Sequence, residues 1–199
     1  MVEEIYRKAG VGISVKALPA RRATFEAKEG VRDGEIMRIL TNHGAESQLY
    51  RIPYSLGDVK TQVYVQELNS QLPIKNLSLY SVAVVRGIRH ANTYVKDFPH
   101  VIQVDDVAMA IRLLSMGRVD AVVISQLNGE YEIRAQKVKD IVPLSDPVIV
   151  QGLYHYINRQ HPDVIEKIES TLKSMHESGE LKALWKRYAE KELNEAAAK

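Results

Sequence analysis

Cysteine is absent from this chain of 199 residues. Its absence excludes disulfide bonds, zinc sites with cysteine ligands and catalysis by a thiol. A run of about 18 consecutive apolar residues is also missing, so the sequence predicts no segment that spans a membrane. Glu3 and Glu4 follow Met1 where a signal peptide has a basic start and an apolar stretch, so we expect no signal peptide in this chain.

An excess of charge of either sign is absent as well. The sequence has 27 Lys and Arg against 25 Asp and Glu, which gives a formal net charge of +2. A chain so close to balance offers no electrostatic case for binding nucleic acid or a membrane surface. The hydrophobic fraction of 45% and the charged fraction of 26% are typical of a globular protein. The length suffices for one large domain or two small ones.

Common catalytic and cofactor-binding patterns are missing. The chain contains no Gly-x-Gly-x-x-Gly, Walker loop or Gly-x-Ser-x-Gly, and no two of its six histidines have the spacing of a helical metal pair. The adjacent Asp105 and Asp106 suit the start of a helix better than paired acid and base chemistry. An enzyme, for instance a hydrolase that uses Ser125 and His90, is the weakest alternative. We therefore expect no catalytic residues, no metal and no cofactor.

The strongest pattern in the chain lies between residues 79 and 125. Short apolar runs predict three strands, at 79–85, 100–104 and 119–125. The segments between them predict two helices, at 93–97 and 107–116. Such a βαβαβ order predicts a parallel sheet with helical crossovers. Ligands of these sheets bind beyond the carboxyl ends of the strands, and the basic loop 86–92 occupies that place.

The rest of the chain also mixes helices and strands. Helices are predicted at 2–9, 20–29, 161–176 and 180–191, and extended segments at 13–18, 34–40, 58–67, 136–144 and 148–157. Residues 41–57 are predicted as loop, and 127–135 is left open between helix and loop. Gly30 with Asp33 and Gly117 with Asp120 share one arrangement, a helix end followed by a strand, which favours two similar α/β lobes.

Loop and extended segments suggest where two such lobes join. We predict a discontinuous first lobe formed by residues 1–66 and 159–193, and a second lobe formed by residues 77–147. The chain is expected to cross between them at 67–76 and 148–158, and residues 194–199 are expected to be a tail.

Three passages resemble the bacterial extracellular solute-binding proteins of family 3. These are the type II periplasmic binding proteins that deliver amino acids and similar solutes to ABC importers. LPARR at 18–22 with EGVRDGEIMRI at 29–39 is similar to the first-lobe helix and strand of that family. VAVVRGIRH at 82–90, with residues 109–124, is similar to its second lobe. HPD at 161–163 and SGELKALWKRY at 178–188 are similar to its closing helices, and this match is the most specific.

The resemblance implies a fold, a function and a location. The fold is a two-lobed, type II α/β fold in which each lobe is a mainly parallel sheet flanked by helices. The function is solute binding in the periplasm, with the membrane subunits of an ABC importer as partners. We find no counterpart of the arginine-bearing motif with which amino-acid-specific members hold the substrate carboxylate.

One difference from the family concerns the first strand. The chain begins at what resembles the helix after that strand, whose loss exposes two strand edges. Three outcomes follow: the neighbouring strands close up, another segment or chain fills the gap, or the lobe is poorly ordered. Self-association through an exposed edge is therefore a further expectation.

A basic loop carries the main prediction for a binding site. Arg86, Gly87, Ile88 and Arg89 lie between a buried strand and a helix start. Backbone N–H groups and guanidinium groups at such a place favour a carboxylate or another anion. The alternative is a solvated basic loop without a ligand.

Other strand ends and aromatic residues add secondary candidates. Arg38 ends a first-lobe strand and is predicted to bind the ligand, with an ion pair to Glu35 or Glu46 as its alternative role. Ser125 ends a second-lobe strand and offers a hydroxyl, with a simple helix cap as the alternative. Tyr54 is a candidate aromatic wall, with packing as its alternative role.

The sequence thus predicts a binding protein rather than an enzyme. We expect a small, anionic or zwitterionic, amino-acid-like solute to bind in a cleft between the lobes, as part of an ABC-type importer. The alternative is a sensor or interaction module with a degenerate cleft, in which an exposed sheet edge pairs with a partner. Nucleic acid is not an expected partner.

Overall fold

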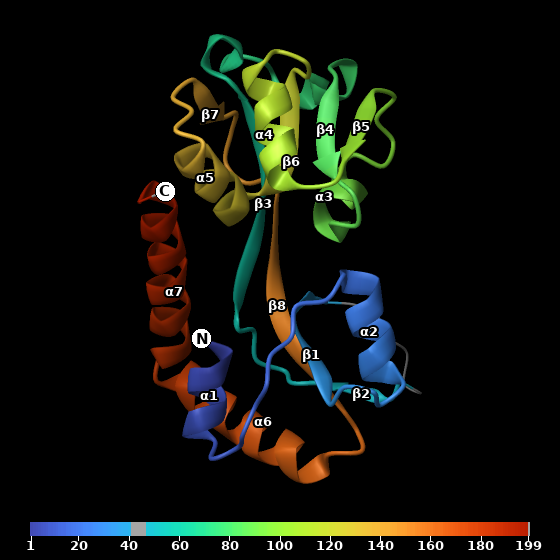
Figure 1. Ribbon diagram of the computed structural model, residues 1–199, viewed down its shortest axis with the longest axis vertical. Helices are drawn as coiled ribbons and strands as arrows, with labels where there is room; N and C mark the ends of the chain where they lie inside the picture. Colours follow the sequence, from blue (N-terminus) through green and yellow to red (C-terminus); the bar gives the residue numbers. More distant parts are fainter. Residues whose placement is uncertain (41–46, 199) are drawn as a thin grey trace. The chain divides into compact units, whose positions relative to one another are not determined.

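The chain folds into two compact units. The computed structural model describes residues 1–40 and 47–198 (Figure 1). Unit 1 comprises Met1–Asp58 and Gln151–Tyr188, and unit 2 comprises Val59–Val150 and Ala189–Lys199. The chain therefore passes between the units after residues 58, 150 and 188. No helix in the described part of the chain is both long enough and apolar enough to cross a membrane.

Unit 1 is built on a small antiparallel sheet. Its strands are β1 (Gly34–Ile39), β2 (Leu49–Arg51) and most of β8 (Ile149–Asn158). β8 is central, because the same part of β8 pairs with β1 along one edge and with β2 along the other. The helices are α1 (Val2–Lys8), α2 (Ala20–Lys28), α6 (Pro162–Glu177) and the first half of α7 (Glu180–Ala197).

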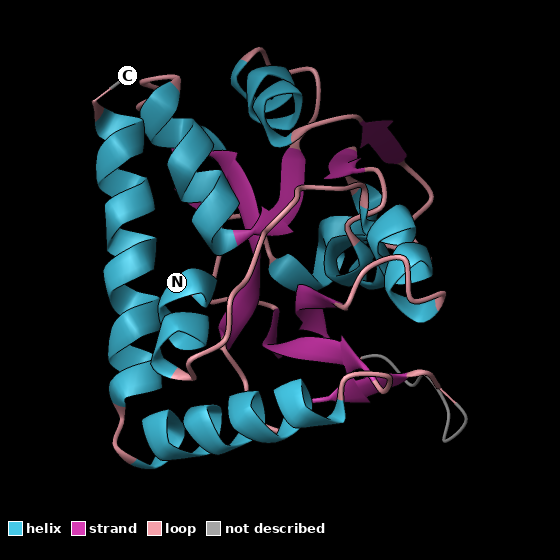
Figure 2. Ribbon diagram, turned by 60° about the horizontal axis from the view of Figure 1, so that its bottom comes forward, coloured by secondary structure: helices cyan, strands magenta, loops and turns pink. Residues whose placement is uncertain are grey.

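The core of unit 1 is formed largely by the apolar faces of its helices. Ile168, Leu172 and Met175 recur at helical spacing along α6 and are buried together with residues of α1 and α7. Pro162 starts α6 at a position where its missing N–H costs no helical hydrogen bond. Figure 2 shows α6 and α7 as long helices that meet at a short turn. Gly179 allows this turn because it adopts the left-handed conformation, with a φ of 77°.

Unit 2 is a mixed sheet with helices on both faces. Its strands are β3 (Gly57–Gln66), β4 (Val82–Val85), β5 (Val101–Val104), β6 (Ala121–Ser125) and β7 (Ile141–Pro143). β4 pairs in parallel with both β5 and β6, and β3 pairs antiparallel with β6 and β7. The helices are α3 (Arg89–Tyr94), α4 (Val107–Ser115), α5 (Gln126–Ala135) and the short 3-10 helices η1 (Glu67–Asn69) and η2 (Ile74–Leu79).

Side chains alternate along β3, so the core of unit 2 lies on both faces of the sheet. Tyr64 packs with α4 residues such as Ile111 on one face. Val63 packs with Ala91 of α3 and Val84 of β4 on the other face. Both faces of β4 and β6 are covered, so these strands are buried throughout. The α/β class and the parallel β4–β6 core predicted from the sequence are confirmed.

The boundary between the units differs from the prediction. Residues 67–76 were expected to cross between lobes, but they belong to unit 2 and include η1. The chain instead passes between units within β3, a 10-residue strand long enough to belong to both. The end of the chain differs too, because α7 continues to Ala197 and residues from Ala189 onward belong to unit 2. Ala196 is fully buried, which explains why the segment expected to be a tail continues the helix.

Secondary structure in unit 1 also differs from the prediction. Its strand pairs are antiparallel rather than mainly parallel, because β8 returns from unit 2 between β1 and β2. Residues 13–18 form no strand, and β2 lies in a segment predicted as loop. In unit 2 the strand predicted at 136–144 is reduced to β7, and the ambiguous stretch 127–135 is helical.

Candidate functional site

The carboxyl ends of β4 and β6 meet at one edge of the unit 2 sheet. Val84 of β4 pairs with Val123 of β6 in parallel register. Two residues further along each strand, Arg86 and Ser125 therefore occupy corresponding positions at this edge. Edges of this kind are where open α/β sheets bind ligands. The structure thus brings together Ser125 and the predicted loop 86–89.

The loop after β4 is held by its own backbone and by Asn92. Gly87 adopts the left-handed conformation, with a φ of 80°, which a glycine accepts without steric cost. The Asn92 side chain donates hydrogen bonds to the carbonyls of Val85 at 2.8 Å and Ile88 at 2.7 Å. These bonds fix the turn between β4 and α3. The side chains of Arg86 and Arg89 remain exposed to solvent.

Arg86 has only a weak partner within unit 2. Its Nε atom lies 3.5 Å from a carboxylate oxygen of Asp105, and 67% and 90% of the two side chains are exposed. Exposed ion pairs contribute about 1 kcal/mol or less. The guanidinium of Arg86 is therefore available to a second anion.

A buried polar cluster lies beside Ser125. Thr61 of β3 is the register partner of Ser125, so the two side chains lie on the same face of the sheet. The hydroxyl of Thr61 lies 2.7 Å from Nδ1 of His90, which α3 brings onto this face. All three residues are buried. Burial lowers the pKa of His90, which favours the uncharged imidazole.

Ser125 is available for more than helix capping. It occupies the N-cap position of α5, yet its side chain makes no capping hydrogen bond. The simple capping role considered from the sequence is therefore not what its hydroxyl does. Beyond Ser125, the first N–H groups of α5 have no acceptor within the helix. This edge thus offers guanidinium groups, a hydroxyl and backbone donors, a set suited to a carboxylate.

Arg38 lies in unit 1 and already has a buried partner. Its Nε atom lies 3.1 Å from a carboxylate oxygen of Glu35, whose side chain is 3% exposed. Thr24 donates to the same oxygen at 2.8 Å and accepts from Arg38 at 3.3 Å. Glu46, the other partner considered from the sequence, lies outside the described residues. The structure therefore shows for Arg38 the ion pair that the sequence left as its alternative role.

A bulge in β1 places Arg38 beside Glu35. The register against β8 shifts between Glu35 and Arg38, so one extra residue is accommodated on β1. Met37 takes a left-handed φ of 56° at this point, which is uncommon for a residue with a side chain.

Tyr54 also lies in unit 1 and packs locally. Its ring centroid lies 5.5 Å from that of His176 on α6, and the ring packs against the unit 1 core. Packing was the alternative role considered for Tyr54. Neither Tyr54 nor Arg38 belongs to unit 2, which contains the other candidate residues.

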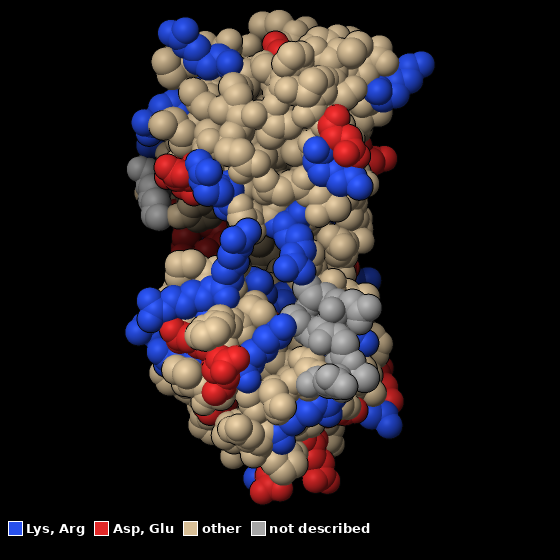
Figure 3. All heavy atoms as spheres, turned by 90° about the vertical axis from the view of Figure 1, so that its right-hand side faces the viewer, with Lys and Arg blue, Asp and Glu red and all other residues tan. Residues whose placement is uncertain are grey.

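The surface of unit 1 near α2 is basic. Arg21 and Arg22 are exposed on α2, and Arg22 and Arg32 both pair with the carboxylate of Glu26, at 2.6 and 3.2 Å. On the face shown in Figure 3, blue Lys and Arg atoms outnumber red Asp and Glu atoms over this unit. Across residues 1–40 and 47–198, no group of three or more acidic or histidine side chains is placed to hold a metal ion.

Sequence reasoning missed the contribution of Thr61 to the site and considered His90 only for a hydrolase. A signal for Thr61 was present, because alternation in β3 puts this polar residue on the apolar face with Val63 and Val65. Its contact with His90 joins positions 29 residues apart. No local pattern reveals such a contact.

Known structures share this fold. No protein-family model and no curated protein matches the sequence. The GluR0 ligand-binding core in complex with L-glutamate aligns with a TM-score of 0.77 at 14% identity, covering 98% of this chain and 86% of that chain. AbpA from Streptococcus pneumoniae, an amino acid ABC transporter substrate-binding protein bound to L-arginine, aligns with a TM-score of 0.75 at 15% identity, covering 99% and 83%.

A third similar structure comes from a different kind of protein. A histidine kinase sensor domain with similarity to periplasmic binding proteins aligns with a TM-score of 0.74 at 18% identity, covering 94% of this chain and 82% of that chain. At these identities the likeness shows the fold. The chain has a periplasmic-binding-protein-like α/β fold of the kind found in amino-acid-binding proteins of ABC transporters, as the sequence resemblance implied.

Proposed function

We propose that the chain binds a small anionic or zwitterionic, amino-acid-like solute without making or breaking a covalent bond in it. The observation that carries this proposal is the meeting of Arg86, Arg89 and Ser125 at the carboxyl edge of the unit 2 sheet. Exposed guanidinium groups and free backbone N–H groups suit a carboxylate, because charge-assisted hydrogen bonds are stronger than neutral ones. The hydroxyl of Ser125 adds a neutral hydrogen-bonding group.

Two features of the site support a role in binding rather than catalysis. Nδ1 of the buried His90 is engaged with Thr61, so this nitrogen is not free to activate Ser125 as a nucleophile. The side chains of Arg86 and Arg89 project from a loop whose backbone is held by Asn92, which favours a preorganised binding surface. In this proposal Arg38 and Tyr54 of unit 1 are secondary ligand residues, since each already has a partner in its own unit.

The similar structures support a proposal for the cellular role. Similar structures include substrate-binding proteins of amino acid ABC transporters. We infer the same role for this chain: it delivers its solute to the membrane subunits of an ABC importer in the periplasm.

A sensor or interaction module is the second candidate function. The similar histidine kinase sensor domain favours it. Among the described strands, β1 pairs only with β8, which leaves its other edge open to a partner strand. In this alternative the solute site is degenerate and the output is an interaction with a partner. Sedimentation velocity over a range of concentrations tests edge pairing: a mass that rises with concentration and stays monomeric in Ile39→Lys supports it, and a constant monomer mass contradicts it.

A thermal-shift screen tests the proposed binding function. The panel contains amino acids, polyamines, small carboxylates and sugars. A solute at about 100 times its Kd stabilises the folded protein by about 2.7 kcal/mol, so a saturable rise in Tm identifies the solute class. Arg86→Ala and Arg89→Ala should each weaken binding about tenfold or more through lost charge-assisted bonds.

Arg118→Ala is the matched control for this screen. Arg118 is exposed like Arg86, but it precedes β6 and so lies at the amino ends of the parallel strands, opposite the proposed site. Its removal changes the net charge equally and should leave binding unchanged. Equal losses in all three variants would show nonspecific attraction to positive charge and would contradict the proposed site.

A further inference from the structure

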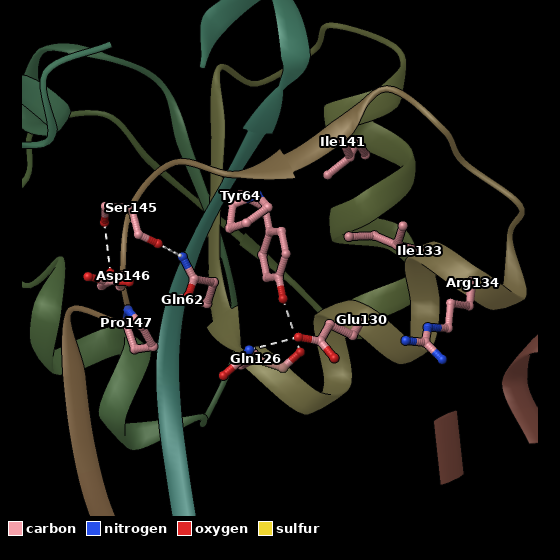
Figure 4. Close-up of a pocket in the computed structure, with 11 residues that line it drawn as sticks. Gln62, Tyr64, Gln126, Glu130, Ile133, Arg134, Ile141, Ser145, Asp146 and Pro147 are labelled. Carbon is pink, nitrogen blue, oxygen red and sulfur yellow. Dashed lines mark hydrogen bonds between the residues drawn. The ribbon is translucent and has the colours of Figure 1, made fainter. Parts of the chain in front are cut away.

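A pocket opens in unit 2 on the opposite face of the sheet from Ser125. It has a volume of about 310 Å³ and lies between β3, α5 and the segment 141–147 (Figure 4). Gln62 and Tyr64 of β3 line it, whereas Thr61 points to the other face because side chains alternate along a strand. The pocket is therefore separate from the carboxyl-edge site proposed above.

Hydrogen bonds hold the polar side chains of this pocket in place. Gln62 donates through Nε2 to the carbonyl of Ser145 at 2.7 Å, and Tyr64 donates through its hydroxyl to the carbonyl of Gln126 at 3.0 Å. Gln126 donates through Nε2 to Oε1 of Glu130 at 2.8 Å. Figure 4 shows the Tyr64 hydroxyl, Gln126 and Glu130 next to one another.

The polar side-chain atoms of the pocket that take no part in these hydrogen bonds are acceptors. Both amide hydrogens of Gln62 are directed at carbonyls, of Ser145 and Val63, so its Oε1 atom remains an acceptor. Glu130 keeps its Oε2 atom, and the Tyr64 oxygen keeps a lone pair after donating its hydrogen. A ligand that provides several hydrogen-bond donors suits this arrangement.

Glu130 sets the charge inside the pocket. The other charged lining residues, Arg134 and Asp146, are exposed and carry opposite signs, so together they add no net charge. Burial and then the negative charge of Glu130 raise the pKa of Tyr64, which agrees with an electronegative interior. Ile133, Ile141, Pro143 and Pro147 supply apolar walls.

We propose that this pocket binds a small organic cation, a primary ammonium group carried on a short aliphatic body. The ammonium group has three donors and no acceptor, which matches the free acceptors of Gln62, Tyr64 and Glu130. The aliphatic body lies against the apolar walls.

Titration with n-butylamine tests this inference. The protein is labelled with 15N, and its amide signals are followed at pH 7 as n-butylamine, n-butanol or butyrate is added. We expect saturable shifts of the signals of Gly129 and Ile133 with n-butylamine, and an affinity at least about tenfold lower for the other compounds. Equal affinity for n-butanol would show a merely apolar pocket and would overturn the proposal.

Two variants on the same helix provide the matched comparison. Glu130→Gln removes the charge but keeps the side-chain size, and it should weaken n-butylamine binding at least about tenfold. Glu132→Gln is the control, because Glu132 also bonds a glutamine four residues away, Gln136, at 3.3 Å, yet does not line the pocket. The proposal is wrong if Glu130→Gln binds like the unchanged protein, or if both variants lose affinity equally.

The result of the n-butylamine experiment does not depend on the proposed solute site. Arg86→Ala should leave n-butylamine binding unchanged, and Glu130→Gln should leave the Tm rise with the solute unchanged. If Glu130→Gln does not fold, Ile133→Phe provides a second test, because a larger side chain narrows the pocket from its apolar wall. Unaltered n-butylamine binding in a folded Ile133→Phe variant would place the amine elsewhere.

Discussion

At the scale of single residues, the most unusual group is the buried His155 in unit 1. Its Nδ1 atom lies 2.9 Å from the carbonyl oxygen of Glu35, and its Nε2 atom lies 2.6 Å from the hydroxyl of Tyr6. Nδ1 therefore carries the hydrogen, and Nε2 accepts from Tyr6. Burial lowers the pKa of His155 to about 4. Burial also raises the pKa of Tyr6 to about 12, with Asp33 as a smaller cause.

Acidification should destabilise the protein through His155. The folded-state pKa lies below the unfolded value of about 6.5, so the unfolded chain binds more protons between these values and stability falls as pH decreases through this range. We expect a loss of about 2 kcal/mol from pH 7 to pH 4.5 from this residue alone. Urea unfolding at both pH values should show a smaller loss in His155→Gln than in His100→Gln, where an exposed histidine is changed. The same loss of stability in both variants would contradict the attribution of the pH dependence to His155.

Arg38 allows a test between structural and ligand-binding roles. Its guanidinium neutralises Glu35, whose side chain is buried, so Arg38→Met should reduce the free energy of unfolding by about 2 kcal/mol. The double variant Arg38→Met with Glu35→Gln should recover part of this loss, because no buried charge is then left alone. Urea unfolding of the three proteins measures the effect. An unchanged stability combined with lost solute binding would instead make Arg38 a ligand residue.

At the scale of elements, a glycine determines how α7 packs on the start of β3. A Cβ atom at Gly57 would lie 2.2 Å from Cδ2 of Trp185, closer than any real contact. Gly57→Ala should therefore destabilise the protein by about 1–3 kcal/mol through overpacking. Gly12→Ala is the control, since a Cβ atom there meets nothing within 4 Å. Thermal unfolding should show a lower Tm for Gly57→Ala alone, and equal Tm values would show that Trp185 moves aside freely.

Elements buried on both faces were the ones the sequence predicted best. β4 and β6 are continuous apolar runs, and such runs need no periodic pattern to be recognised. β2 has three residues, too few for any period to show, and the segment around it carries Pro53. α3 begins at Arg89 rather than at the predicted residue 93. The Asn92 side chain holds the turn before this helix, because it donates to the carbonyls of Val85 and Ile88.

The candidate site was predictable only in part. The loop from Arg86 to Arg89 could be placed because topology puts the ends of parallel strands at the ligand-binding edge. The position of Ser125 beside Thr61 depends on the register of β3 against β6. Thr61 in turn contacts His90, which comes from a distant part of the sequence. The register of β3 against β6 is a property of the tertiary structure, and local sequence does not specify it.

At the scale of the whole molecule, the fold is of a kind found in binding proteins, and the chemistry of one edge of the unit 2 sheet suits a small anionic solute. Similar structures include a substrate-binding protein of an amino acid ABC transporter, the GluR0 ligand-binding core in complex with L-glutamate and a histidine kinase sensor domain. Binding of a small solute distinguishes the proposed function from the alternative of an interaction module with a degenerate site. The central claim is therefore that such a solute binds at the carboxyl edge of the unit 2 sheet.

Amide NMR with the solute found in the thermal-shift screen tests this claim most directly. We expect the largest ligand-induced shifts at Gly87, Arg89 and Ser125, with little change at Gly117 and Arg118 at the opposite ends of the strands. The double variant Arg86→Ala with Arg89→Ala should lose these shifts while staying folded. Saturable binding whose shifts lie elsewhere, or no binding of any compound by the cooperatively folded protein, would contradict the account.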